Sequence, residues 1–376
     1  MVKKVQDLAQ KLLFPAGIII DGDNPWDIKV NDERMFSRVF GEGNLGSGES
    51  YMDGWWDCGR LDEFFYKILY YRVDEKLIWN WPFIREAILS KLFNRQAGKK
   101  AFVIGEKHYD TGNDLFGPML GKTMAYSCGY WSSPAGEAKN LDEAQEAKFD
   151  LICRKLGLEP GMTLLDIGCG WGGFMKYAAE RYGAKATGIT VSKEQVGFGR
   201  ELCKGLPVEI RLQDYRSLNE KFDRIASVGM IEHVGYKNYR EYMRVAKRCL
   251  KKSGIFLLHT IGGEASSGFS DPWIEKYIFP NSHLPSLKQL MKAVEGIFVV
   301  EDIHNFGSDY DGTLMAWYRN FENSWPSLEK KYGERFRRMW RYYLLSCAGM
   351  FRARRANLWQ IVLSKDGVPG GWKSVR

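Results

Sequence analysis

Apolar and polar positions change their pattern near residue 140. Beyond it, short apolar runs typical of buried strands alternate with segments whose apolar residues recur at helical spacing. The predicted strands are residues 162–167, 184–190, 208–213, 222–228, 254–260, 298–303 and 358–363, and the main helices are 141–157, 174–182, 193–204 and 238–250. This alternation predicts an α/β fold with a seven-stranded, mostly parallel sheet and a helical insertion near residues 313–356.

The first hundred residues lack this alternation. Helices are predicted at residues 5–13, 61–73 and 76–93, short strands at 17–20 and 27–30, and a glycine- and tryptophan-rich loop at 41–57. Residues 92–100 are basic and have turn character, which is typical of a linker. We therefore predict a smaller N-terminal α+β domain at residues 1–100 and a catalytic domain at 101–376.

Composition narrows the class of protein. Hydrophobic residues make up 45% of the 376 residues, which indicates a large core, and a net charge of +8 permits an anionic partner without requiring one. Seven scattered cysteines contain no CxxC pair, which argues against a disulfide framework or a metal site and favours a reducing cytoplasm. No apolar run approaches the ~20 residues of a spanning helix. DGDNPWD after LLFPAGIII also argues against a signal peptide.

A cofactor motif follows the first predicted strand of the sheet. In LLDIGCGWGGF, Asp166 ends the strand, and Gly168 and Gly170 lie in the turn to a helix. The GxGxxG spacing also occurs in dinucleotide enzymes, but these need an acidic residue about 20 positions later, where this chain has Thr190. With Asp214 after the third strand, the pattern fits S-adenosylmethionine (SAM) better.

Two further ionisable residues stand at the ends of neighbouring strands. Glu232 follows the fourth strand in VGMIEHVG, and His259 ends the fifth in FLLHTIG. Carboxyl ends of adjacent parallel strands meet at one edge of a sheet, so both side chains are expected in the crevice that holds the cofactor. Each residue taken alone is also compatible with a structural role. Together they favour a catalytic site.

The motifs taken together resemble bacterial cyclopropane-fatty-acyl-phospholipid synthases over almost the whole chain. The motifs that carry the resemblance are YSCGYW, LDIGCGWGG, GITVSKEQ, LQDYR, VGMIEHVG, FLLHTIG, DPWIEKYIFPN, HNFGSDYD, TLMAWY and CAGMFRAR. The resemblance implies an enzyme that adds a methylene, derived from the SAM methyl group, across a cis double bond of a phospholipid acyl chain. Mycolic-acid cyclopropane synthases lack the long N-terminal domain, so its presence favours the phospholipid branch and implies a role in positioning lipid.

The resemblance also implies individual site residues. It places a bicarbonate ion, acting as the base, among Cys128, Glu232, His259, Ile261 and Tyr310, with Cys128 and Ile261 contributing mainly backbone groups. It assigns Tyr126, Ser127, Gln195 and Asp214 to SAM, and Thr190 assists where an acidic residue is lacking. A direct protein base, Glu232 or His259, remains the alternative. The aromatic rings around Cys128 are suited to stabilise positive charge on carbon by cation–π attraction.

The expected partners follow from the lipid substrate, and rival functions would imply other partners. Basic aromatic segments at residues 91–100, 335–343 and 351–359 are candidates for peripheral docking to the inner, cytoplasmic face of an anionic membrane. The resemblance implies a homodimer. A SAM-dependent amine or fatty-acid methyltransferase is the main rival, a non-enzymatic lipid-binding module is another, and a nucleic-acid partner is not expected.

Overall fold

The computed structural model describes residues 2–77, 112–133, 136–267 and 270–376. Two compact units divide the chain: the first takes residues from Met1–Phe93, Gly268–Pro280 and Tyr310–Ala356, and the second from Asn94–Ser267, Asn281–Asp309 and Asn357–Arg376. The predicted boundary at residue 100 lies outside the described residues. The domain limits 1–100 and 101–376 therefore stay a prediction.

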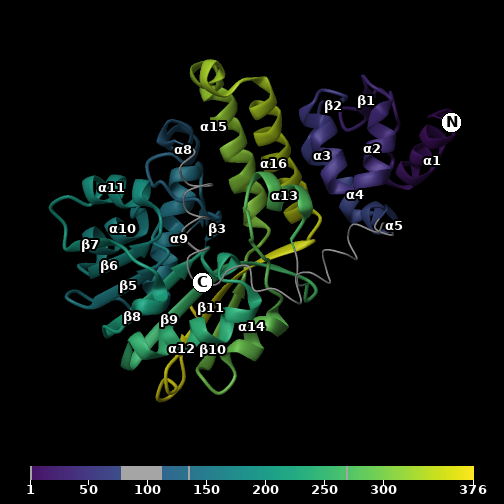
Figure 1. Ribbon diagram of the computed structural model, residues 1–376. Helices are drawn as coiled ribbons and strands as arrows, with labels where there is room; N and C mark the ends of the chain where they lie inside the picture. Colours follow the sequence, from purple (N-terminus) through teal and green to yellow (C-terminus); the bar gives the residue numbers. More distant parts are fainter. Residues whose placement is uncertain (1, 78–111, 134–135, 268–269) are drawn as a thin grey trace. The chain divides into compact units, whose positions relative to one another are not determined.

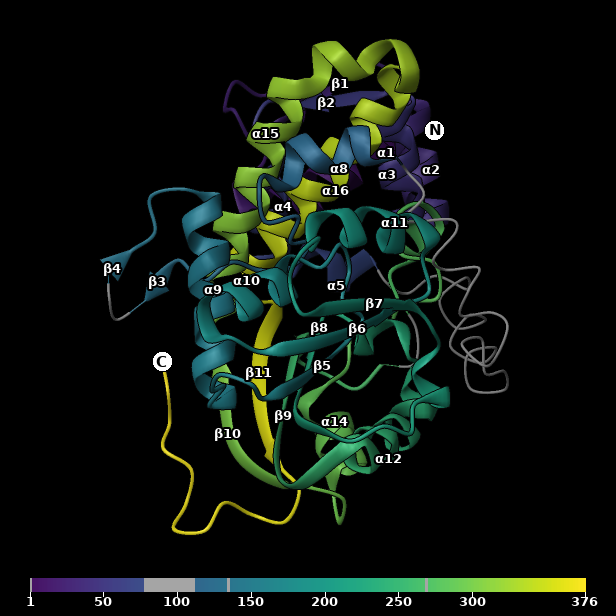
Figure 2. The same ribbon diagram turned by 90° about the vertical axis from the view of Figure 1, so that its left-hand side faces the viewer.

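The second unit is built on a seven-stranded sheet of order β10-β11-β9-β8-β5-β6-β7 (Figure 2). Its strands are β5 (Thr163–Ile167), β6 (Lys185–Thr190), β7 (Val208–Leu212), β8 (Phe222–Val228), β9 (Leu250–Gly263), β10 (Val299–Asn305) and β11 (Ala356–Ser364). The pairs β5–β6, β6–β7, β5–β8 and β8–β9 are parallel, and β10–β11 is antiparallel. The strand order reverses at β5, between β6 and β8, and ligands bind at such a point in open α/β sheets.

Helices cover both faces of this sheet (Figure 1). On one face lie α9 (Leu141–Leu156), α10 (Gly173–Tyr182) and α11 (Lys193–Leu202); on the other lie α12 (Tyr239–Cys249) and α14 (Leu287–Val294). The unit also contains α8 (Asn113–Leu120), the hairpin β3 (Ser132–Ser133) and β4 (Gly136–Glu137), and the short 3₁₀ helices η2 (Tyr215–Ser217), η3 (Ile231–His233) and η4 (Tyr236–Asn238). Two apolar cores, one on each side of the sheet, hold these layers together.

Local sequence explains these elements. Helix α9 begins where the Asn140 side chain accepts a hydrogen bond from the backbone N–H of Glu143, and it ends at Gly157, whose φ of +56° suits glycine. Strand β5 is buried along nearly its whole length, as expected for a central parallel strand. Each strand and helix predicted beyond residue 140 corresponds to an observed element, so this part of the prediction is confirmed.

The first unit is mainly helical. It contains α1 (Val2–Leu13), η1 (Phe14–Ala16), α2 (Arg34–Glu42), α3 (Asn44–Met52), α4 (Leu61–Tyr70), α5 (Val73–Leu77), α13 (Pro272–Tyr277), α15 (Asp309–Tyr332, all but its first residue) and α16 (Glu334–Arg352). Strands β1 (Ile28–Val30) and β2 (Trp56–Cys58) form a two-stranded antiparallel sheet. Helix α16 packs against α3 and α4, so the predicted helical insertion is grouped with the N-terminal elements.

The loop predicted for residues 41–57 is wrong, because much of it is helix α3. Its glycines permit close packing: a Cβ at Gly48 would lie 2.3 Å from the Trp273 ring, and one at Gly46 would lie 2.3 Å from the carbonyl oxygen of Arg38. Tertiary contact thus outweighs the low helix propensity of glycine. The strand predicted at residues 17–20 is also wrong, since only Ile20 forms an isolated bridge, to Ile28.

Candidate active site

The turn after β5 depends on two glycines. Gly168 has a φ of +87°, which glycine adopts readily, and a Cβ there would lie 2.9 Å from the Cβ of Met230. At Gly173, the first residue of α10, a Cβ would lie 1.9 Å from the carbonyl oxygen of Thr123. The backbone is therefore closely packed around this turn, and the start of α10 supplies unpaired N–H groups suited to an electron-rich ligand.

A pocket of about 150 Å³ opens beside this turn, roughly ten times the volume that one water needs. All eight residues predicted to contact the cofactor line it: Tyr126, Ser127, Asp166, Gly168, Gly170, Thr190, Gln195 and Asp214. They come from separate segments that the sheet brings together. The pocket wall also includes Lys148, Trp171, Arg216 and Met230, which were not predicted from the sequence.

The far side of the pocket is held by short polar contacts. The hydroxyl of Thr190 donates to Oε1 of Gln195 at 2.6 Å, and the side chain of Ser192 caps α11 by accepting from the backbone N–H of Gln195. Asp214 accepts from the guanidinium of Arg216 at 2.8 Å and from its backbone N–H at 2.9 Å. These bonds fix the side chains that follow β6 and β7 before any ligand binds.

Asp166 supplies a buried carboxylate to the pocket. Its side chain is 2% exposed, and Oδ1 has no hydrogen-bond partner among the described residues. Burial raises the pKa of Asp166 to about 7, although the nearby Lys148 ammonium acts in the opposite direction. A buried acceptor without a donor is costly. The ammonium group of a SAM molecule would satisfy it, so this residue fits the predicted cofactor.

The YSCGYW segment is anchored from several sides. Gln145 of α9 donates to the carbonyl oxygen of Ser127 at 2.8 Å, and the N–H of Tyr130 donates to the carbonyl oxygen of Ala144 at 2.8 Å. The N–H of Trp131 donates to the carboxylate of Asp309 at 2.7 Å. The segment is thus a fixed wall of the pocket.

Glu232 lies in η3, just after β8. Its Oε1 accepts from the backbone N–H of Ile261 at 2.8 Å, whereas Oε2 is buried and has no hydrogen-bond partner in the described part of the chain. Burial raises the pKa of Glu232 to about 7, and hydrogen bonds, including that from Ile261, offset part of the effect. A carboxyl group in this state is able to exchange a proton near neutral pH.

His259 lies in β9, two residues before Ile261. The side-chain NH₂ of Gln360 lies 3.3 Å from Nδ1. With the amide in this orientation it donates to Nδ1, which puts the ring proton on Nε2. That Nε2 is buried and has no hydrogen-bond partner within the described ranges. Burial, together with Lys148 and Lys155, lowers the pKa of His259 well below its usual range, so the ring is neutral and presents a donor.

The structure brings some of the predicted base residues together. Glu232 and Ile261 are hydrogen-bonded, and His259 shares a strand with Ile261. Cys128 is fully buried in the YSCGYW segment; from that segment Tyr130 contacts Phe306, which in turn contacts the His259 ring at 5.9 Å between centroids. These four predicted residues lie outside the lining of the cofactor pocket.

Tyr310 belongs to the first unit, at the start of α15. There its ring packs on Phe351, with centroids 4.5 Å apart, and on Trp317 at 5.9 Å. Its participation in one site with Cys128, Glu232 and His259 stays a prediction.

Lys148 and Gln145 are the main site residues that the sequence prediction missed. Both lie on α9 and are 0% exposed. Lys148 donates to the hydroxyl of Ser127 at 2.7 Å. A signal was present in the sequence: Lys148 and Lys155 are seven positions apart and so share one helix face, which here is the buried face.

Comparison with solved structures identifies the class of fold. The cyclopropane synthase MmaA2 from Mycobacterium tuberculosis has a TM-score of 0.66 and 30% identity, over 72% of this chain and 100% of that one. Mycolic acid cyclopropane synthase CmaA1, in a complex with SAH and CTAB, has a TM-score of 0.64 and 33% identity, over 70% and 98%. The sheet, the glycine turn and these relatives define the chain as an enzyme of the SAM-dependent methyltransferase class, as predicted.

Sequence relatives define the family. The model of the mycolic acid cyclopropane synthetase family matches residues 96–361, and the chain belongs to this family. It is 53% identical to the cyclopropane-fatty-acyl-phospholipid synthase of Escherichia coli K12, over 98% of this chain and 95% of the relative. A probable fatty acid methyltransferase of Pseudomonas putida is 38% identical over 70% of this chain and 69% of its own. The predicted family is therefore confirmed.

Proposed function

We propose that this enzyme transfers a methylene group derived from SAM to the cis double bond of an unsaturated phospholipid acyl chain, forming a cyclopropane ring. The observation that carries the proposal is the 53% identity to the Escherichia coli synthase across 98% of the chain. This similarity includes the first unit, whose N-terminal elements precede the residues matched by the family model. A shared catalytic unit alone would leave the lipid class open.

The site residues fit the chemistry that such a reaction demands. When bound, SAM supplies an electrophilic methyl group to the alkene, which then carries positive charge and must lose a proton for the ring to close. No side chain can neutralise carbon-centred charge without being alkylated, so aromatic faces such as those of the YSCGYW segment are suited to stabilise it. Glu232 supports the proposal as a carboxyl group able to exchange a proton near neutral pH, and His259 supports it as a hydrogen-bond donor at Nε2.

We propose that Glu232, His259 and Ile261, with Cys128 and Tyr310, hold a bicarbonate ion that supplies the base. Two observations support this. His259 presents a donor at Nε2 and Glu232 presents an acceptor at Oε2, and neither atom has a partner in the described residues. Bicarbonate carries both an acceptor oxygen and an O–H, so it complements this pair, whereas the two groups acting alone leave both atoms unsatisfied.

Analysis of membrane lipids tests the proposed methylene transfer to acyl chains. After expression in a host without such an enzyme, membrane lipids should gain one CH₂ per modified chain, lose olefinic proton signals and acquire cyclopropane methylene signals in NMR spectra. The relative in Pseudomonas putida makes a fatty acid methyltransferase the second candidate. A gain of one carbon that appears as a methyl or methylene branch, without cyclopropane signals, would favour that candidate.

The bicarbonate proposal needs a separate measurement. The initial rate of the wild-type enzyme should fall in carefully decarbonated buffer and recover when bicarbonate is added. Glu232→Gln should bind SAM nearly as well as wild type but turn over far more slowly. A wild-type rate that ignores carbonate, with the ion shown to have been removed, would leave Glu232 or His259 as a direct base.

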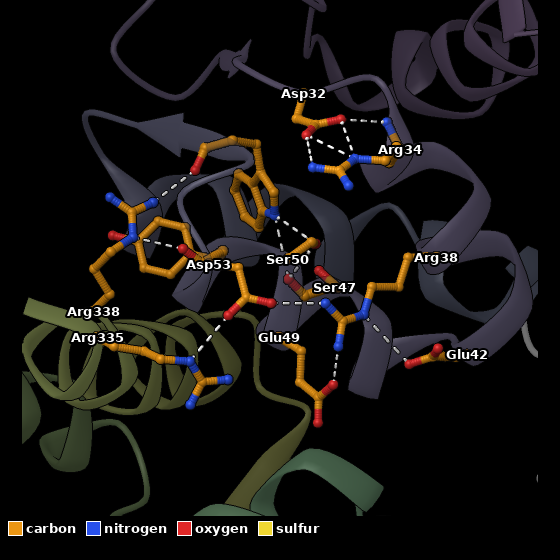
Figure 3. A network of polar contacts seen from close by, with 12 residues as sticks. Asp32, Arg34, Arg38, Glu42, Ser47, Glu49, Ser50, Asp53, Arg335 and Arg338 are labelled. Atoms are coloured by element: carbon orange, nitrogen blue, oxygen red, sulfur yellow. Dashed lines mark hydrogen bonds and ion pairs between the residues drawn. The ribbon is translucent and has the colours of Figure 1, made fainter.

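The substrate also requires access to a lipid surface. No helix of the described residues is long and apolar enough to cross a membrane. The predicted docking segment at residues 91–100 lies outside those residues, and the arginines of the two other segments are largely engaged within the first unit. Their carboxylate partners are Asp53 for Arg335, Glu322 for Arg337 and Arg341, Asp57 for Arg338, Asp62, Glu63 and Asp311 for Arg352, and Glu75 for Arg355. Figure 3 shows Arg335 beside Asp53 in this network.

We propose that peripheral docking relies instead on apolar side chains near the N-terminus. Phe14 is 70% exposed, and Leu8 and Ile19 are also exposed. Because burying a phenylalanine contributes about 2 kcal/mol, Phe14→Ser should weaken binding to phosphatidylglycerol vesicles roughly tenfold or more. Val299→Ser, at another exposed apolar position, should have no effect, and equal losses in both variants would contradict the proposal. A homodimer stays a prediction.

A further inference from the structure

Gln360 is a polar residue in the middle of a buried strand. It is 0% exposed in β11, and its neighbours along the strand, from Leu358 to Leu363, are apolar and buried. Its amide nitrogen lies 3.3 Å from Nδ1 of His259, whereas its Oε1 has no hydrogen-bond partner among the described residues. Burial of a half-paired amide costs about 1–3 kcal/mol, which an apolar side chain would avoid. The contact with His259 is therefore what this glutamine provides.

The sheet fixes this contact from both sides. Strand β11 lies between β10 and β9, and β9 carries His259. In β10 the residue directly opposite Gln360 is His304, whose Nδ1 lies 2.9 Å from Nζ of Lys155 on α9. Directly opposite residues of an antiparallel pair present their side chains on one face of the sheet. Gln360 thus belongs to a row of polar side chains that crosses the sheet on the face covered by α9.

The hydrogen bond determines what His259 can do. A neutral imidazole carries one N–H and one lone pair, so an amide that donates to Nδ1 occupies the lone pair and leaves the proton on Nε2. The reverse orientation of the amide would bury its NH₂ where Oε1 now has no partner, and unpaired N–H groups are rarer in protein interiors than unpaired carbonyl oxygens. Burial and the charges of Lys148 and Lys155 also oppose protonation of both nitrogens.

We propose that Gln360 is a positioning residue that holds His259 as a hydrogen-bond donor at Nε2 and thereby excludes this histidine as the base. The inference rests on the proposed function and deepens it. Nε2 already carries a proton, and the lone pair of Nδ1 is directed at Gln360, so neither nitrogen can take a proton from the substrate cation. When the C–H bond of the cation breaks, its electron pair closes the ring, and the proton passes to the proposed bicarbonate or to Glu232.

Nuclear magnetic resonance of the full-length protein with ¹⁵N-labelled histidine tests the state of the ring. Long-range ¹H–¹⁵N correlation spectra distinguish protonated from unprotonated ring nitrogens, and His259→Gln assigns the signal by its loss. We expect a neutral ring with the proton on Nε2, unchanged from about pH 6 to 8. His283 is an internal reference, because its Nε2 contacts the carbonyl oxygen of Ser267, which can only accept. A proton on Nδ1, or titration of His259 in the range where the rate rises with pH, would overturn the proposal.

Two variants test whether the tautomer matters for turnover. Gln360→Met keeps the chain length but removes the donor, so His259 should populate both tautomers and turnover should fall about tenfold. The affinity for S-adenosylhomocysteine should change less than about threefold, because Gln360 and His259 lie outside the lining of the cofactor pocket. Val362→Ala weakens the packing of the same strand without touching a polar group, so it should lower the unfolding temperature but leave the tautomer and turnover unchanged.

The outcomes separate positioning from a structural role. Unchanged turnover in Gln360→Met, or equal losses of turnover in Gln360→Met and Val362→Ala, would overturn the positioning role. The spectrum of the wild type decides the state of His259 even if Gln360→Met does not fold. Host lipids that gain no cyclopropane ring would instead overturn the proposed reaction.

Discussion

Replacement of Glu232 by glutamine should make the protein more stable at high pH, although the change removes a proposed catalytic group. The Glu232 carboxyl group is 5% exposed, and burial raises its pKa to about 7 from an ordinary value of 4.5. Below the pKa that Glu232 has in the unfolded chain, the carboxyl is neutral in both the folded and the unfolded state and adds no pH dependence to the free energy of unfolding. As pH rises from about 4.5 to 7, the unfolded chain releases the proton before the folded protein does, so stability falls.

The magnitude follows from the two pKa values. A pKa of about 7 against 4.5 corresponds to about 3 kcal/mol of destabilisation, fully present above pH 7. Glutamine does not ionise, and its carbonyl oxygen can still accept the N–H of Ile261. The unfolding temperature of the variant should therefore exceed that of wild type by several degrees at pH 8, because about 1 kcal/mol shifts a unit of this size by roughly 2–4 °C.

Calorimetry of the ligand-free protein in carbonate-free buffers from pH 4.5 to 8.5 measures this difference. The two unfolding temperatures should converge at the acid end and separate as pH rises. Glu295→Gln makes the same chemical change at an exposed position and should follow wild type throughout. Parallel curves for Glu232→Gln and wild type across the whole range would refute the argument that Glu232 is buried without adequate compensation.

Two further predictions concern the backbone around the pocket. Gly173→Ala should lower both the unfolding temperature and the affinity for S-adenosylhomocysteine, because its Cβ would lie 1.9 Å from the carbonyl oxygen of Thr123. The control Gly197→Ala meets no atom within 4 Å and should be neutral or stabilising by up to about 1 kcal/mol. Thermal unfolding and calorimetric titration distinguish the two variants. Asp309→Ala should cost about 1–3 kcal/mol by removing the carboxylate that accepts from the N–H of Trp131. Asp309→Asn keeps an acceptor oxygen and should recover most of this loss in a denaturant titration; equal losses would contradict this account.

The sequence correctly predicted those elements whose apolar pattern is explained by residues close together in the chain. Strand β5 and its glycine turn were found because a buried apolar run leads directly into residues with a restricted backbone. The helix at Asn44–Met52 was missed because its glycines are explained by Trp273, more than 200 positions away in the chain. The pairing of Arg335 with Asp53 was unpredictable for the same reason, since charge along the chain does not reveal which carboxylates the fold brings near.

For the site residues, position along the sheet was predictable from the sequence, but electrostatic state was not. Asp166 and Glu232 were identified as strand-end residues, and the parallel sheet places such residues along one edge. Their electrostatic state required the structure, because only the folded positions of the described segments show that Oδ1 of Asp166 and Oε2 of Glu232 have no partner among them. Lys148 carries a helical signal in the sequence, but only the fold shows that its buried face adjoins the cofactor pocket.

The ionisable groups of the site share one property, which links stability to function. Burial raises the pKa values of Asp166 and Glu232 and lowers those of Lys148 and His259, so in each case it disfavours the charged form. The ligand-free protein is therefore destabilised by groups that do not satisfy one another. Bound SAM and the proposed bicarbonate ion would supply partners for these groups, and ligands that bind only the folded state stabilise it by mass action. The same unsatisfied atoms that weaken the free enzyme would then favour ligands with complementary charges.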